Sequence, residues 1–192
     1  MADYALVVID MQKFFFVENK EIDQRRLAEN CREIIEISRR ASVPVIHVVT
    51  LYREDRTDWP NAWRRDPESW CANLAMGQDL SDIVDGIVIK PEDLVVQKKR
   101  FSAFYNTNLD DILRSLRCRR IYLIGYSADV CIRFTSVDAY NRGYSVGIIY
   151  EGIESFRETR ESSMKYLEWT INAECVPMES YRELAGHDCG DG

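Results

Sequence analysis

The chain has 192 residues, of which 25 are lysine or arginine and 32 are aspartate or glutamate, giving a formal net charge of -7. This length suits one domain with a substantial core. Because acidic and basic residues are interspersed and no basic run occurs, we expect no nucleic-acid partner, and the acidic balance favours solubility.

The N-terminus and the cysteines indicate the compartment. The first residues lack the basic region and cleavage site of a signal peptide, and no apolar stretch approaches the roughly 20 residues of a membrane span. Six cysteines lie far apart without a CxxC pair, unlike a zinc site or a disulfide scaffold. We therefore expect free thiols, a cytoplasmic location, no membrane association, and one domain over residues 1–185 with a flexible tail at 186–192.

Six short β-rich runs alternate with helical patterns along the chain. Near-continuous apolar runs of this kind are typical of strands covered on both faces. Apolar residues recur at helical spacing in 27–35, 109–116 and 164–171, and Ser155 with Glu158 matches a capping box for the last helix. This alternation predicts an α/β fold, a three-layer α/β/α domain around a six-stranded parallel, doubly wound sheet. The predicted strands are Ala5–Ile9, Val43–Thr50, Leu94–Gln97, Arg120–Gly125, Ser145–Tyr150 and Ala173–Met178.

The stretch Tyr52–Gly86 does not follow this alternation. It places Trp59, Trp63 and Trp70 among many charged residues and contains two prolines. We predict an excursion from the sheet with short helices rather than a second domain.

Three ionisable residues occupy equivalent places in the predicted strands. Asp10 and Lys98 directly follow their strands, and Cys131 lies beyond a third, where a glycine turn precedes a helix. Ligands of open parallel sheets bind at the carboxyl ends of the strands, near a topological switch point. Each residue by itself has an ordinary explanation, as a turn residue, a surface charge or a small buried side chain. Their matching positions favour one site.

These three side chains suit acyl transfer. Asp10 would accept the Cys131 proton and later deliver it to a leaving amine. The Lys98 ammonium would hold Asp10 ionised and lower the pKa of Cys131, and a helix N-terminus would also favour the thiolate. Backbone N–H groups at Ser127 and Cys131 would form an oxyanion hole. The expected reaction proceeds through a thioester that water then hydrolyses.

Three ordered motifs resemble the isochorismatase-like cysteine hydrolases, which include nicotinamidases, ureido-group amidohydrolases and N-carbamoylsarcosine amidase. Ala5–Phe15 is similar to the family's opening strand with its Asp-Met-Gln motif. Lys98–Leu109 is similar to its Lys-x-x-Phe-Ser-x-Phe motif, and Gly125–Cys131 resembles its nucleophile loop. The resemblance covers roughly residues 4–171.

The resemblance implies an isochorismatase-like, Rossmann-like fold and a catalytic triad of Asp10, Lys98 and Cys131. It also implies a non-proline cis peptide bond between Tyr126 and Ser127. Members of the family commonly form dimers and tetramers, so a homodimer or homotetramer is expected.

The sequence departs from the family pattern at two places. Ala128 replaces a usual threonine of the nucleophile loop, so a side-chain hydroxyl is lost there. Thr50–Asp58 lacks the histidines of the metal-binding nicotinamidases, so we predict no metal and no other cofactor, and nicotinamidase activity is less expected. His47, within a strand, and His187, in the tail, are poorly placed to be the base.

A small aromatic-lined pocket is expected beside the triad. Aromatic side chains more often pack cores than touch substrate, so these assignments are hypotheses. Arg53 would suit a substrate carboxylate, although a surface charge is the more ordinary interpretation. For Glu151, which directly follows the fifth predicted strand, a structural role is favoured over a role in the site. The candidate pocket residues are Phe15, Tyr52, Arg53, Trp59, Phe101, Tyr105 and Tyr126.

Three functions stay open for a small-molecule substrate that the sequence does not identify. The favoured one is cysteine-dependent cleavage of a C–N bond in a small amide, ureide or carbamoyl compound, with release of ammonia or an amine. The second is an isochorismatase-type cleavage of a vinyl ether with Asp10 as the acid, against which Cys131 argues. The third is a non-catalytic family member.

Overall fold

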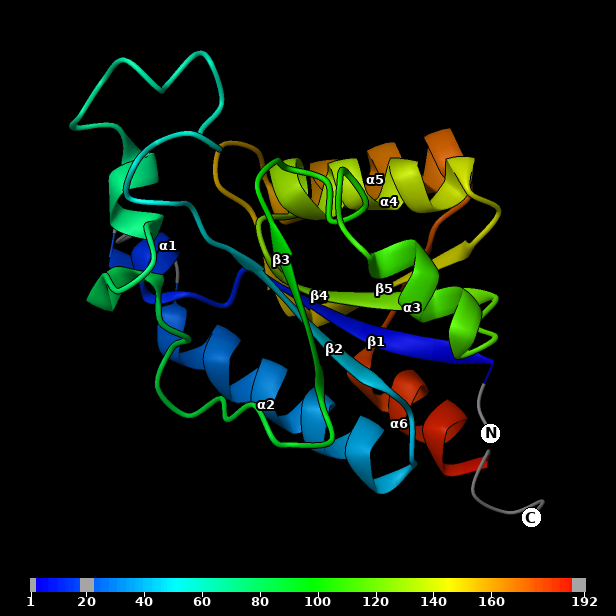
Figure 1. Ribbon diagram of the computed structural model, residues 1–192. Helices are drawn as coiled ribbons and strands as arrows, with labels where there is room; N and C mark the ends of the chain where they lie inside the picture. Colours follow the sequence, from blue (N-terminus) through cyan, green and yellow to red (C-terminus); the bar gives the residue numbers. More distant parts are fainter. Residues whose placement is uncertain (1–2, 18–22, 188–192) are drawn as a thin grey trace.

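A single six-stranded sheet forms the centre of the structure, and all of its strands are parallel (Figure 1). The computed structural model describes residues 3–17 and 23–187. The strand order is β3-β2-β1-β4-β5-β6, so the chain switches direction across the sheet between β1 and β4. The strands are β1 Tyr4–Ile9, β2 Val45–Thr50, β3 Leu94–Lys98, β4 Arg120–Tyr126, β5 Ser145–Glu154 and β6 Glu174–Val176.

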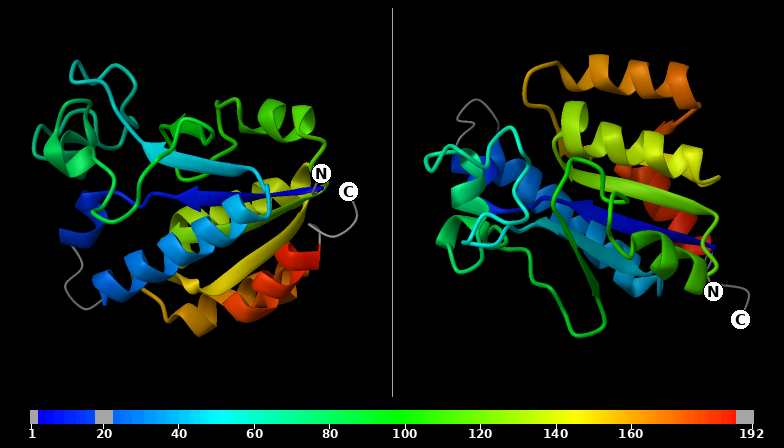
Figure 2. Two further views of the ribbon diagram at one scale, coloured as in Figure 1. Left: turned by 90° about the horizontal axis from the view of Figure 1, so that it is seen from below. Right: turned by 45° about the horizontal axis from the view of Figure 1, so that its top comes forward.

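Helices cover both faces of this sheet (Figures 1 and 2). Successive residues of a strand point to opposite faces, so Val7 packs in one core with α3, α4 and α5, while Val8 packs in another with α2 and α6. The predicted three-layer α/β/α fold is therefore confirmed. The helices are α1 Lys13–Val17, α2 Gln24–Arg40, α3 Leu109–Ser115, α4 Arg133–Asn141, α5 Arg160–Ile171 and α6 Met178–His187, with 3-10 turns η1 Trp70–Leu74 and η2 Asp79–Ser81 and a π-helical turn η3 Ala128–Ile132.

Two predictions concern a membrane span and the C-terminal tail. None of the helices in residues 3–17 and 23–187 is long and apolar enough to cross a membrane. Helix α6 continues through His187, so the first two residues of the predicted tail belong to a helix. The rest of that predicted tail, 188–192, lies outside the described residues.

The predicted capping box at Ser155 is wrong. Strand β5 continues four residues beyond the predicted end, through Glu154, so Ser155 and Glu158 lie in the following loop. The N-cap of α5 is Thr159, whose side chain accepts a hydrogen bond from the backbone of Ser162. Thr159 supplies the acceptor that the first turn needs, so the helix begins later.

Glu151 has the structural role that the sequence favoured. Its carboxylate accepts the backbone N–H of Met178, the first residue of α6, at 2.8 Å. Its carbonyl accepts a hydrogen bond from the side chain of Asn30 in α2. Glu151 therefore ties β5 to the two helices that cover one face of the sheet.

Gly125 allows β1 and β4 to approach closely at the switch point. Its φ is +113°, and a Cβ built there would lie 2.0 Å from the carbonyl oxygen of Ile9. Only glycine permits this conformation and this contact. Asp10, directly after β1, and the loop after β4 are thus held side by side.

Asp129 anchors the loop between β5 and α5 to the loop after β4. Its carboxylate accepts the backbone N–H groups of Phe156 at 2.9 Å and Arg157 at 2.7 Å. Burial opposes the charge on Asp129, but these two donors outweigh it, so the pKa of Asp129 is lowered.

Asp129→Ala is expected to lower the free energy of unfolding by about 1–2 kcal/mol at pH 7, because two partly buried backbone N–H groups lose a charged acceptor. A lowered pKa means that this stabilisation is present above the unfolded value of 3.8 and is lost as the pH falls through the folded value. Urea denaturation at pH 7 and at pH 3 measures the difference. Glu92→Ala, at an exposed loop carboxylate, is the control and should change little. Equal effects of the Asp129 substitution at both pH values would contradict the charged role.

Candidate active site

The ends of strands β1, β3 and β4 carry the candidate site at the carboxyl edge of the sheet. Asp10 follows β1 and Lys98 ends β3, while Cys131 lies in η3, shortly after β4. Parallel strands bring these ends to the same edge, and β1 and β4 flank the switch point where ligands of such sheets bind. The structure therefore brings together the three residues that the sequence grouped.

The Lys98 ammonium contacts both of the other residues. Its Nζ lies 2.8 Å from Asp10 Oδ2 and 3.4 Å from Cys131 Sγ. Asp10 and Lys98 are fully buried, and Cys131 is 8% exposed. Burial opposes the charge on Lys98, but attraction to the Asp10 carboxylate opposes that effect, and the pKa of Lys98 is raised, so the group is an ammonium at neutral pH.

The predicted direction of the Lys98 effect on the Cys131 pKa is confirmed, but the net pKa of this thiol is raised. Burial raises the pKa of this thiol, and the nearby Asp10 carboxylate adds to the rise. Lys98 acts in the predicted direction but does not overcome the cost of burying a negative charge. Cys131 is therefore a thiol at neutral pH.

The loop that carries Cys131 is compact. The peptide bond between Tyr126 and Ser127 is cis. The Ser127 carbonyl accepts the N–H groups of Val130 at 3.2 Å and Ile132 at 3.0 Å, which winds η3 as a π-helical turn around Cys131. Ser127 and Cys131 thus lie in one turn, where their N–H groups stay our predicted oxyanion donors.

Thr50 belongs to the site and was not singled out from the sequence. It ends β2, directly between β1 and β3, and pairs in register with Lys98. Its hydroxyl donates to Asp10 Oδ1 at 2.8 Å and accepts from Lys98 Nζ at 2.7 Å. The available signal was a hydroxyl at the end of a predicted strand, but only the strand order places it between the base and the cation.

Two predicted pocket residues, Tyr52 and Trp59, lie in the core of the excursion after β2. Both are at most 2% exposed and pack with Cys71 and Leu74. The Trp59 indole donates to the carbonyl of Arg53 at 2.9 Å. These side chains shape the excursion from within, and any contact with substrate stays a prediction.

Arg53 lies on the surface of the same excursion. Its guanidinium forms an ion pair and hydrogen bonds with Asp55, and both side chains are about half exposed. Asp55 in turn accepts from Thr57. The structure therefore gives Arg53 a local partner, in keeping with the more ordinary interpretation.

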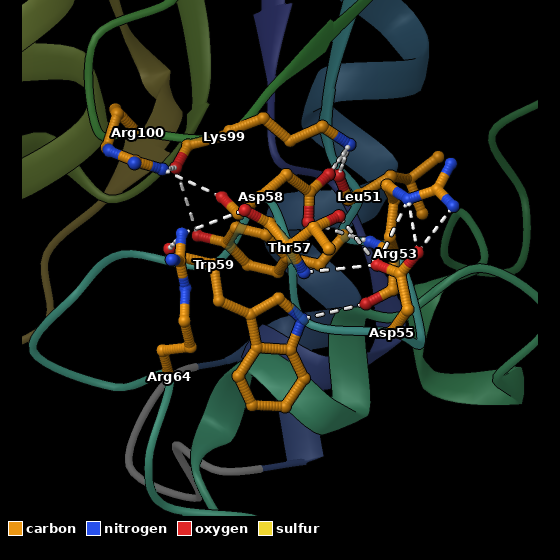
Figure 3. Close-up of polar contacts among 10 residues, drawn as sticks. Leu51, Arg53, Asp55, Thr57, Asp58, Trp59, Arg64, Lys99 and Arg100 are labelled. Carbon is orange, nitrogen blue, oxygen red and sulfur yellow. Dashed lines mark hydrogen bonds and ion pairs between the residues drawn. The ribbon is translucent and has the colours of Figure 1, made fainter.

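Asp58 and Lys99 join the excursion to the end of β3 (Figure 3). Asp58 accepts the backbone N–H of Arg53 at 2.9 Å, and its other oxygen lies 3.1 Å from Lys99 Nζ. Lys99 also donates to the carbonyl of Leu51, and Arg100 donates to the carbonyl of Asp58 at 3.2 Å. Lys99, which directly follows Lys98, thus holds the loop that follows Thr50.

Asp58→Ala is expected to make residues 53–65 more accessible to trypsin, by about 10-fold in cleavage rate, because a charged acceptor is removed from the loop. Arg53, Arg56 and Arg64 provide cleavage sites, and mass spectrometry of the fragments locates the cut. Asp79→Ala, at an exposed carboxylate in the same excursion, is the matched control. Similar cleavage of the parent protein and the Asp58 variant would show that other contacts hold the loop.

The remaining pocket candidates fall into two groups. Phe15 and Tyr126 are largely buried, with ring centroids 5.7 Å apart, and Tyr126 directly precedes Ser127. Phe101 is 45% exposed and stacks on Phe134, whereas Tyr105 is 52% exposed. The first pair lies beside the nucleophile loop, and the second group lies on the surface beyond β3.

The described residues show no cluster of three or more His, Cys, Asp or Glu side chains that could hold a metal ion. His47 is buried in β2 and lies 3.3 Å from Asp93, which also pairs with Arg39. Burial lowers the pKa of His47 despite this carboxylate, so the imidazole is neutral at pH 7. It belongs to a structural cluster apart from the triad.

An open parallel sheet with a carboxylate, an ammonium and a thiol in contact at its carboxyl edge defines a candidate cysteine hydrolase. Residues 4–179 match the isochorismatase domain model. Because the match spans most of the chain, this protein belongs to the isochorismatase family, as the sequence motifs indicated.

Individual relatives agree with this assignment. Ureidoacrylate amidohydrolase RutB of Agrobacterium fabrum is 28% identical over 171 residues, which cover 78% of this chain and 75% of that protein. The uncharacterised isochorismatase family protein YaaI of Bacillus subtilis is 29% identical over 192 residues, covering 95% of this chain and 98% of the relative. The crystal structure of N-carbamoylsarcosine amidase from Thermoplasma acidophilum has a TM-score of 0.77 and 28% identity, covering 92% and 96% of the two chains.

Proposed function

We propose that the protein is a cysteine-dependent hydrolase that cleaves a C–N bond in a small amide, ureide or carbamoyl compound through a thioester. The observation that carries this proposal is the contact of one ammonium, Lys98 Nζ, with both Asp10 at 2.8 Å and Cys131 at 3.4 Å. The names of two relatives, ureidoacrylate amidohydrolase and N-carbamoylsarcosine amidase, support a substrate of this class.

The reaction begins with a proton transfer from Cys131 to Asp10. The S–H bond breaks, and the sulfur forms a bond to the carbonyl carbon of the substrate. Lys98 stabilises the negative charge as it moves to the sulfur, and the backbone N–H groups of Ser127 and Cys131 receive the oxyanion. The C–N bond then breaks, and Asp10 gives its proton to the leaving amine.

The second half of the reaction restores the protein. Asp10, again ionised, takes a proton from water as the water attacks the thioester carbon. The C–S bond breaks and the thiol of Cys131 regains a proton from Asp10. A resting thiol suits this cycle, because its proton is the one that the leaving amine needs.

The other two functions have less support from the site. A vinyl-ether hydrolase using Asp10 as the acid would leave Cys131 without a task. A non-catalytic protein would have no use for a buried charge pair, which is costly to desolvate and is often found at functional sites.

An assay of ammonia release tests the proposal. The purified protein is incubated with simple amides, ureides such as ureidoacrylate, carbamoyl compounds such as N-carbamoylsarcosine, and the vinyl ether isochorismate. We expect ammonia from at least one C–N substrate and no pyruvate from isochorismate. Pyruvate without ammonia would contradict the proposal and favour the vinyl-ether reaction.

A further inference from the structure

We propose that Thr50 is a positioning residue that gives the two oxygens of Asp10 different tasks, leaving Oδ2 to receive the Cys131 proton. This inference rests on the proposed function. Thr50 ends β2, so its side chain lies between Asp10 on one neighbouring strand and Lys98 on the other. It is 3% exposed and contacts the base and the cation together.

The direction of these hydrogen bonds follows from the chemistry of the donors. A lysine ammonium can only donate, so the Thr50 oxygen accepts from Lys98 Nζ at 2.7 Å. The single hydroxyl proton then points to Asp10 Oδ1 at 2.8 Å. Asp10 Oδ2 lies 2.8 Å from Lys98 Nζ but accepts no hydrogen bond of regular geometry within residues 3–17 and 23–187. Oδ2 is therefore the oxygen open to a proton.

The Lys98 ammonium has more neighbours than protons. Its three N–H groups face Thr50 Oγ1 at 2.7 Å, Asp10 Oδ2 at 2.8 Å, the Arg100 carbonyl at 3.2 Å and Cys131 Sγ at 3.4 Å. At rest its N–H groups donate to Thr50 Oγ1, the Arg100 carbonyl and Cys131 Sγ, while Asp10 Oδ2 is held by charge attraction. When the Cys131 proton moves to Oδ2, the Lys98 N–H that already faces Sγ stabilises the new thiolate. Thr50 and the Arg100 carbonyl hold the other two N–H groups in place during this transfer.

The position of Thr50 is fixed independently of the triad. Gln12, which is fully buried, donates to the Thr50 carbonyl at 3.0 Å and accepts the Thr50 N–H at 2.8 Å. The same amide donates to the carbonyl of Ser81 at 2.7 Å. Gln12 therefore fixes the Thr50 backbone through contacts that do not involve Asp10, Lys98 or Cys131.

Thr50→Val removes the hydroxyl and keeps the shape of the side chain. We expect kcat to fall about 10- to 100-fold with little change in KM, because a donor to a charged group is lost without a substrate contact. The acid limb of the pH profile should move to higher pH, because the hydroxyl that bonds the Asp10 carboxylate and the Lys98 ammonium is lost. The titratable groups that face Asp10, namely Lys98, Cys131 and Tyr52, stay in the variant. Thr50→Ser should restore both values.

Alkylation of Cys131 by iodoacetamide between pH 4 and pH 8, followed by mass spectrometry, provides a readout that needs no substrate. Its acid limb should move in the same direction in Thr50→Val. Ser38→Ala is the control, because it also removes a buried hydroxyl, one that bonds Ile34 and Tyr181 in the opposite core. That variant should lose stability without a shift in either profile. If Thr50→Val does not fold, Thr50→Ala removes the same hydroxyl.

The outcomes separate this inference from the proposed function. A shifted alkylation profile in Thr50→Val, without ammonia from the parent protein on any substrate, would support the positioning role and count against the proposed function. Unchanged alkylation and pH profiles in Thr50→Val, or failure of Thr50→Ser to restore them, would overturn the positioning role even if the parent protein releases ammonia.

Discussion

Cys131→Ala is expected to abolish ammonia release, by about 10⁴-fold or more, because no other group in the proposed site can form the thioester. The substitution removes one sulfur atom from a small side chain, so the loss of stability should stay within about 2 kcal/mol. Ammonia release at saturating substrate measures the first effect, and thermal unfolding checks the second. Mass spectrometry of the parent protein during turnover should show an acyl adduct on the peptide that contains Cys131.

Cys118→Ala is the matched control for this prediction. Cys118 is a buried thiol whose pKa burial raises to about 11, and it lies before β4, at the opposite end of that strand from the site. Its loss should leave ammonia release within about 2-fold of the parent. If Cys131→Ala instead retains more than a few per cent of the activity, the thiol is not the nucleophile, and catalysis by Asp10 alone becomes the better explanation.

Lys98→Met is expected to lower the free energy of unfolding by about 3–5 kcal/mol and to abolish activity, because it leaves the Asp10 carboxylate buried without a counter-charge. The raised pKa of Lys98 means that the parent holds this stabilisation through neutral pH. It is lost only as the pH rises through the folded pKa, above the ordinary value of 10.5. Urea denaturation at pH 7 measures the loss.

The double variant Asp10→Asn/Lys98→Met distinguishes a charge effect from a simple loss of packing. With both charges removed, no buried ion is left unpaired, so we expect the double variant to be more stable than Lys98→Met by about 2 kcal/mol. It should still be inactive. Strictly additive losses from the two single substitutions would show that the two charges are not coupled.

Much of this site follows from the sequence because strand ends are easily recognised. Asp10 and Lys98 each end an apolar run, and a parallel sheet gathers such ends at one edge. Thr50 ends an apolar run in the same way, yet a threonine at that position is ordinary in any strand. Its role depends on β2 lying between β1 and β3, and strand order is not encoded in local pattern.

Other features of the structure depend on burial and on strand pairing, which the spacing of residues in the sequence does not reveal. The sign of the Cys131 pKa shift reflects a competition between burial and the charge on Lys98, and only the folded structure gives the extent of burial. The N-cap of α5 is Thr159 rather than Ser155 because β5 remains paired with β4 as far as Glu154. The aromatic residues of the excursion follow no period, so the burial of Trp59 could not be read from its neighbours.

The raised pKa of Cys131 also bears on the resistance of this protein to oxidation. Peroxides attack the thiolate, so a thiol that stays protonated at rest reacts with them slowly. The 8% exposure of Cys131 further limits access by an oxidant. The burial that keeps Cys131 protonated therefore also protects it, and this thiol should persist under aerobic conditions that oxidise exposed thiolates.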